Sequence, residues 1–167
     1  MRSIQAILVL GLAACGGGGG GASEPGPPVG AAAAFSATAE VLSATQSAGA
    51  ITLSMAPTSS APALIEVHVA LPAELRVGQQ GALTARAPVA LEGDFDGNDF
   101  VVLCGDTSNA AAPPLPEGAL FDLRVEPTEP RTPGTYEVVF RELRAATSAG
   151  QPAPLAATTF QVSVVIE

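Results

Sequence analysis

The chain has 167 residues, 47% of them hydrophobic, and its 7 basic and 16 acidic side chains give a formal net charge of −9. Affinity for phosphate backbones and anionic headgroups comes largely from Lys and Arg, so this balance argues against nucleic acid and anionic lipid as partners. Beyond the N-terminal segment, the length suits one domain of about 130 residues.

The first 14 residues are typical of an export signal. Arg2 precedes the apolar run "IQAILVLGLAA", which is shorter than the roughly 20 residues of a permanent membrane-spanning helix. Its end, Leu12-Ala13-Ala14-Cys15, resembles the bacterial lipobox, in which small residues fit the lipoprotein signal peptidase and the cysteine receives diacylglycerol. The alternative is an ordinary secretory signal with a chance cysteine. The resemblance implies that acylated Cys15 anchors the mature protein to a lipid bilayer.

Residues 15–33 are expected to form the lipidated cysteine and a tether. The stretch "GGGGGGASEPGPPVG" has almost no apolar surface to bury, so burial cannot offset the entropy of ordering it. Gly16 stands where an aspartate would resemble an inner-membrane retention signal. By this resemblance we expect the protein to be attached to the outer membrane of a bacterial envelope. It could face either the periplasm or the exterior.

The second cysteine, Cys104, is the only thiol left once Cys15 is acylated, so no intramolecular disulfide can form. It ends the apolar run "FVVLC", and we expect it to behave as a small buried hydrophobe. A catalytic cysteine would need an activating base, and His68 is the only histidine in the chain. No serine lies in a nucleophile-elbow context. We therefore expect no catalytic residues and no enzymatic activity.

From residue 34 to residue 167, short apolar runs alternate with polar residues at period 2, which is typical of half-buried strands. The run 63–71 places Glu66 and His68 on one side and these residues on the other: Ala63, Ile65, Val67, Val69 and Leu71. The run 119–126 has an inward set of Ala119, Phe121, Leu123 and Val125. Similar runs occupy 49–55, 135–140 and 159–167, separated by proline-rich turns. The pattern predicts an all-β domain over 34–167, an antiparallel β-sandwich.

The acidic run "GDFDGNDF" is oxygen-rich, as calcium ligand sets are. The candidate ligands are Asp94, Asp96, Asn98 and Asp99, with Asp106 as a possible fifth. Asp99 and Gly105 occupy positions where the helix-loop-helix calcium pattern needs a glycine and a glutamate, so this is not an EF-hand. The run predicts either a short calcium-binding turn or an acidic surface turn between two strands.

Two further features bear on ligands. Arg141 and Arg144 could hold a carboxylate or pair with Glu137 and Glu142, and we favour the ion pairs. Sugar-binding platforms stack their ligands on exposed aromatic rings. This chain has no tryptophan, one tyrosine and six phenylalanines mostly at inward positions, which argues against carbohydrate binding.

The order of the segments resembles the cohesin-type jelly-roll sandwich, which is related to cellulose-binding modules. The resemblance covers residues 51–167 and is strongest in "PAEL", similar to a loop of that family, and in "PGTYEVVF" with "SAGQP", similar to its penultimate hairpin. Family members open the second strand with a longer stretch ending in an aromatic and a tyrosine, where this chain has "ALIEVHVAL". A dockerin-binding surface is therefore not carried over.

The resemblance implies a non-catalytic module that recognises a protein, here attached to a membrane and with an unidentified partner. No cofactor is expected unless calcium binds. The alternative function is a calcium-dependent or carbohydrate-binding surface protein that uses the loop from Asp94 to Asp99.

Overall fold

The computed structural model describes residues 31–78, 81–96, 98–106 and 112–167, and for Asp96 only the backbone. The predicted signal and most of the predicted tether lie outside these residues. The described part contains ten strands and no helix, so no helix there could cross a membrane. In chain order the strands are β1 (Phe35–Ala39), β2 (Gly49–Met55), β3 (Leu64–Ala70), β4 (Leu75–Val77), β5 (Leu83–Ala85), β6 (Leu91–Asp96), β7 (Asp99–Gly105), β8 (Gly118–Pro127), β9 (Gly134–Ala146) and β10 (Phe160–Ile166).

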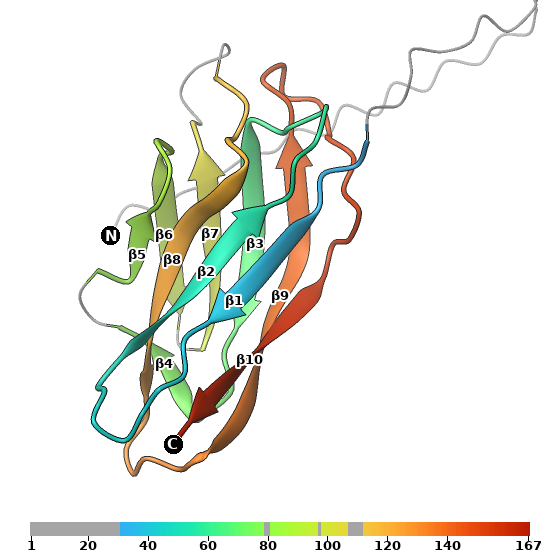
Figure 1. The fold of residues 1–167 in the computed structure, drawn as a ribbon. Coiled ribbons are helices and arrows are strands. Elements are labelled where there is room, and N and C mark those ends of the chain that lie inside the picture. Colours follow the sequence, from blue (N-terminus) through green and yellow to red (C-terminus); the bar gives the residue numbers. More distant parts are fainter. Residues whose placement is uncertain (1–30, 79–80, 97, 107–111) are drawn as a thin grey trace, which may run out of the picture.

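The strands form two antiparallel sheets that pack face to face (Figure 1). One has the order β1-β2-β8-β4, with β5 also pairing with β8, and the other has the order β10-β9-β3-β7-β6. Each sheet has one face on the shared core and one face towards solvent. This confirms the predicted all-β class and sandwich.

The core lies between the sheets and is apolar throughout; among the described residues no polar or charged side chain is buried. In β3 the predicted alternation is confirmed, since Ile65, Val67 and Val69 are fully buried and Glu66 and His68 face the other way. Burial of each large apolar side chain contributes about 1.5–3 kcal/mol. Cys104 is also fully buried, as predicted.

The predicted alternation in the run 119–126 fails at its first position. Ala119 is exposed, whereas Leu120 and Phe121 are both buried. The register of β2 against β8 shifts between Leu53 and Ser54, which marks a β-bulge. A bulge adds one residue to a strand, and this reverses the faces of the residues beyond it. Period-2 counting does not anticipate such an insertion.

We call the junction of β1 and β10 the closed side of the sandwich. Parallel bridges join Ala33 to Leu155 and Leu42 to Ile166 there. The Leu42 N–H donates to the Val165 carbonyl over 2.8 Å, and the Glu167 N–H donates to the Leu42 carbonyl over 2.9 Å. Backbone hydrogen bonds therefore join the two sheets on this side.

Arg131 reinforces the closed side from the β8–β9 loop. Its Nη2 donates to the carbonyls of Leu42 and Ser43, each over 2.6 Å, and its Nη1 donates to the carbonyl of Gln46 over 2.8 Å. The guanidinium has several N–H donors in a fixed plane, so one arginine can donate to all three of these carbonyls. One side chain thus connects the β1–β2 loop to the β8–β9 loop.

We call the opposite side, where β5 lies beside β6, the open side (Figure 1). Both strands are edges of their own sheets, and no bridge between them occurs among the described residues. Gly105 ends β7 on this half of the molecule with φ of 128°, and a Cβ there would lie 2.3 Å from the Ala63 carbonyl oxygen. Only glycine fits this position without displacing the backbone.

Candidate functional site

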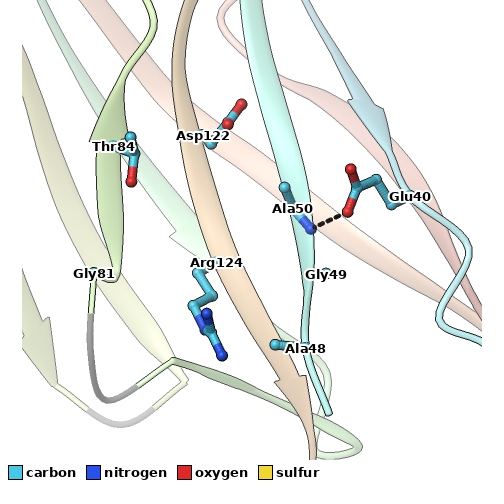
Figure 2. A pocket seen from close by; sticks show the side chains of 8 residues that line it. All are labelled: Glu40, Ala48, Gly49, Ala50, Gly81, Thr84, Asp122 and Arg124. Atoms are coloured by element: carbon cyan, nitrogen blue, oxygen red, sulfur yellow. Dashed lines mark hydrogen bonds between the residues drawn. The ribbon is translucent and has the colours of Figure 1, made fainter. Parts of the chain in front are cut away.

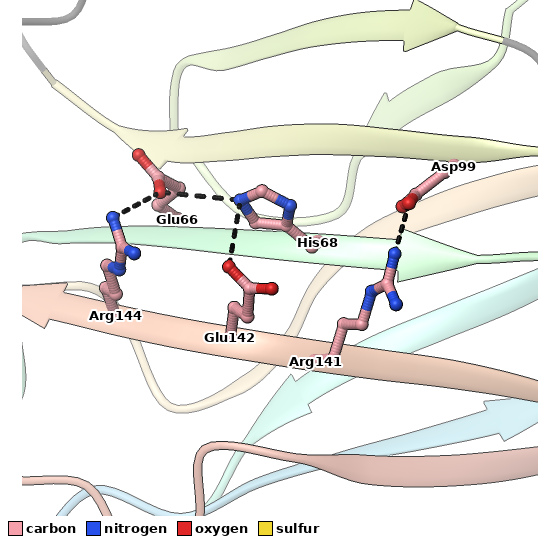
Figure 3. Close-up of polar contacts among 6 residues, drawn as sticks. All are labelled: Glu66, His68, Asp99, Arg141, Glu142 and Arg144. Atoms are coloured by element: carbon pink, nitrogen blue, oxygen red, sulfur yellow. Dashed lines mark hydrogen bonds and ion pairs between the residues drawn. The ribbon is translucent and has the colours of Figure 1, made fainter.

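One surface with several ion pairs is the outer face of the β10-β9-β3-β7-β6 sheet, and we call it the polar face. His68 lies on β3, the central strand of this sheet, and its side chain is 27% exposed. Its Nε2 lies 3.7 Å from Glu66 Oε1 and 4.0 Å from Glu142 Oε2 (Figure 3). The sheet therefore holds a half-buried imidazole between two carboxylates that come from adjacent strands.

A bulge in β9 brings Glu142 to this position. Glu142 has φ of 51°, and among the described residues it is the only non-glycine with positive φ. The pairing of β3 with β9 shifts register at this point, between Glu66 and His68. Leu143 is buried whereas Arg141, Glu142 and Arg144 extend over the polar face (Figure 3). A left-handed conformation at a residue other than glycine is costly, and such strain is concentrated at functional sites.

Both arginines of the polar face form ion pairs, but not with the predicted partners. Arg141 pairs with Asp99 on β7, and Arg144 Nη1 lies 3.5 Å from Glu66 Oε1 on β3. Glu137 accepts a hydrogen bond from the Ser163 hydroxyl over 2.6 Å. The prediction paired residues close in sequence, whereas side chains on a sheet meet their neighbours across strands.

The acidic run forms a hairpin rather than a loop. Asp94 and Asp96 lie within β6 and Asp99 begins β7, with Asp96 directly opposite Asp99. At the tip, the Asn98 amide donates to the Pro72 carbonyl over 3.3 Å, and the Asn98 carbonyl accepts from the Leu71 N–H over 2.7 Å. These contacts hold the hairpin against the β3–β4 turn.

The structure does not bring all five predicted calcium ligands together. Asp99 and Gly105 lie at the two ends of β7, about 20 Å apart at a rise of about 3.3 Å per residue, and Asp106 follows Gly105. Asp99 is paired with Arg141, and the side chain of Asp96 lies outside the described part. In that part no group of three or more His, Cys, Asp or Glu side chains could hold a metal ion. Calcium binding by Asp94, Asp96 and Asn98 remains a prediction.

Cys104 and His68 lie on opposite faces of the same sheet. His68 is opposite Val101 in the β3–β7 register and faces outward, whereas Cys104 is opposite Ile65 and faces the core. Burial raises the pKa of the Cys104 thiol to about 12. The thiol is therefore protonated at neutral pH and separated from the imidazole, so the two do not form a nucleophile and base.

A hollow of about 350 Å³ lies on the outer face of the other sheet, and sequence reasoning did not anticipate it (Figure 2). Its lining residues are Glu40, Ala48, Gly49, Ala50, Gly81, Thr84, Asp122 and Arg124. Glu40 Oε2 accepts from the Ala50 N–H over 3.1 Å, and Asp122 accepts from the Thr52 hydroxyl over 2.7 Å. Arg124 pairs with Glu126 over 3.5 Å. The charged side chains that line the hollow therefore already contact other groups of this chain.

Comparison with family models and with curated proteins finds no match. Comparison with solved structures finds cohesin modules. The sixth cohesin of Acetivibrio cellulolyticus scaffoldin B, solved in complex with a dockerin, has a TM-score of 0.63 at 12% identity over 80% of this chain and 99% of that one. A cohesin module of a Clostridium perfringens family 33 glycoside hydrolase has a TM-score of 0.62 at 10% identity over 81% and 98%.

A non-cellulosomal cohesin from the archaeon Archaeoglobus fulgidus has a TM-score of 0.56 at 14% identity, covering 78% of this chain and 91% of its own. The match thus extends over nearly the whole length of each of these modules. Because the sequence identity is so low, the structural match establishes the fold alone. The chain is a cohesin-like β-sandwich.

Proposed function

We propose that this chain is a non-catalytic protein-binding module whose partner docks on the polar face. The observation that carries the proposal is His68, half-buried at the centre of an exposed sheet and held among cross-strand charges. Charges arranged in this way fix the orientation of a docking protein and exclude wrong partners. The solved cohesin of Acetivibrio cellulolyticus holds a dockerin, which supports a protein partner for the same fold here.

The geometry suits a macromolecule better than a small substrate. The polar face is the open surface of a sheet, and small-molecule sites are usually concave and bury most of their ligand. Arg141, Glu142 and Arg144 are exposed around the half-buried His68. The rim of a protein interface is polar and accessible to solvent, and these exposed charges would form such a rim.

We further propose that acylated Cys15 attaches the module to the outer membrane of a bacterial envelope. The lipobox-like end of the signal and the glycine-rich stretch after it support this, because such a tether would let the domain reach a partner away from the lipid. Replacing the thiol with Cys15→Ser should abolish acyl-label incorporation and move the protein out of the detergent phase. Unchanged partitioning of the variant would contradict the anchor.

The binding proposal is tested by capture from detergent-solubilised envelope with the full chain as bait. Arg141→Glu reverses one charge of an ion pair on the polar face. Arg76→Glu is the matched control, because Arg76 is also exposed and pairs with Glu126 over 3.3 Å on the other sheet. We expect wild type and control to retain the same protein while Arg141→Glu loses it, with similar melting temperatures for the two variants. Equal capture by both variants would contradict the polar face as the docking surface.

A further inference from the structure

β6 ends its sheet, and one of its two backbone edges is unpaired in the described structure. The Gly105 N–H donates to the Ala90 carbonyl over 2.9 Å, so residue 90 directs its backbone towards β7. Backbone groups alternate in an antiparallel ladder. Leu91, Gly93 and Phe95 therefore direct their N–H and carbonyl groups away from β7, as a template for one more strand.

Two carboxylates of β6, Glu92 and Asp94, lack the arginine partner that four carboxylates of other strands have in the described structure. Glu66, Asp99, Asp122 and Glu126 each pair with an arginine. Glu92 and Asp94 are exposed on the polar-face side of β6, and no ion pair or side-chain hydrogen bond joins either to another described residue. An added strand would place its own side chains directly beside these two groups.

The inner side of the same edge is apolar. Phe95 is 41% exposed, one of two large hydrophobic side chains that are exposed in the described part. Its ring lies over Gly93, where a Cβ would come within 2.6 Å of Phe95 Cζ and 2.9 Å of Leu83 Cδ1, and its centroid lies 5.1 Å from that of Phe100. The ring thus partly fills the open side between β5 and β6.

We propose that the free edge of β6 binds an extended, basic segment of another protein by strand addition. Lysine or arginine at alternate positions would face Glu92 and Asp94, and the apolar residues between them would cover Phe95. A second copy of this chain does not fit, because β6 paired with β6 would place carboxylates against carboxylates. This binding is distinct from docking on the polar face.

The test uses the full chain in detergent and a short peptide in which lysine alternates with valine and threonine. Titration calorimetry should show binding, and amide hydrogen exchange should slow at Leu91, Gly93 and Phe95. The double variant Glu92→Gln with Asp94→Asn should weaken the affinity about tenfold, equivalent to about 1.4 kcal/mol. The polar-face variant Arg141→Glu should bind this peptide as well as wild type, which separates this proposal from the proposed function.

Two controls separate strand addition from the simple attraction of a cation. A peptide N-methylated at alternate residues, on the edge that would face β6, lacks the donors for a ladder and should not bind. Equal binding of the methylated peptide, or no effect of the double variant, would overturn the proposal. Sedimentation should show monomers, and a concentration-dependent dimer whose formation slows amide exchange at Leu91, Gly93 and Phe95 would assign the edge to a second copy and overturn the proposal too.

Discussion

The closed and open sides of the sandwich protect their edges by different means. On the closed side, Leu42 exchanges backbone hydrogen bonds with the C-terminal strand region, and Arg131 caps the adjacent carbonyls. On the open side, β6 presents one free backbone edge, an exposed ring and two carboxylates that form no ion pair with a described residue. Edge strands invite pairing unless they are covered or charged. The comparison suggests that the closed side supplies stability and the open side is available for binding.

The largest loss of stability is expected for a leucine on the closed side, and a leucine on the open side provides the comparison. Leu42 is fully buried on the closed side, so Leu42→Ala should lower the free energy of unfolding by about 2–5 kcal/mol. Leu83 on β5 is only partly buried on the open side, so Leu83→Ala should cost about 1 kcal/mol. Urea unfolding measures both. Equal losses would show that the two sides contribute alike.

Removal of Arg131 should have the next largest effect. Arg131→Ala leaves the carbonyls of Leu42, Ser43 and Gln46 without this donor, and hydrogen bonds to charged groups contribute about 1.5–3 kcal/mol. Amide exchange at Leu42 and Glu167 should also accelerate. The control Arg76→Ala removes an exposed ion pair and should cost about 1 kcal/mol or less. A neutral Arg131→Ala would contradict its role on the closed side.

Alkaline pH tests whether water reaches the core from the open side. Cys104 is opposite Leu91 of β6, and burial raises its pKa to about 12, whereas the unfolded thiol ionises near 8.5–9. The native state favours the protonated thiol. Its contribution to stability is therefore complete below about pH 9 and is lost as pH rises towards 12, at about 1.4 kcal/mol per pH unit.

Cys104→Ala should remove this component of the alkaline loss, which is measured by urea unfolding of both proteins between neutral and alkaline pH. A thiol reagent should label wild type only after unfolding. Rapid labelling of the native protein would show that the open side admits solvent to Cys104.

The smallest expected effect concerns calcium at the hairpin tip. The structure places Asp106 away from the other candidates and pairs Asp99 with Arg141, which leaves few oxygen ligands. We expect millimolar calcium to move the thermal midpoint little, and Asp96→Ala to be nearly neutral. Titration calorimetry decides: a saturable heat at micromolar calcium that Asp96→Ala abolishes would favour the calcium-dependent function instead.

The regular parts of the fold could be predicted because their signal is local. Each apolar side chain of β3 alternates with a polar one, and Cys104 follows an apolar run, so burial could be inferred without knowing the neighbours. The edge strand β6 has the sequence "LEGDFD". Its glycine and two aspartates are typical of turns, and the glycine interrupts the apolar side of the strand. Its strand conformation depends on pairing with β7, and sequence periodicity does not report pairing.

The candidate site could be predicted only in part for the same reason. The outward direction of His68 and Glu66 followed from alternation. The approach of Glu142 depends on a bulge in β9 at a residue other than glycine, and no residue type marks it. The partners of Arg141 and Arg144 come from strands far apart in sequence, so their identity required the register of the sheet.

The central claim, that a protein docks on the polar face, is tested most directly by amide hydrogen exchange of the full chain with and without its captured partner. Bound partner should slow exchange in β3 and in the part of β9 around Arg141 and Glu142, and leave β2 and β8 unchanged. Protection confined to β2 and β8, over the hollow on the opposite sheet, would contradict the claim.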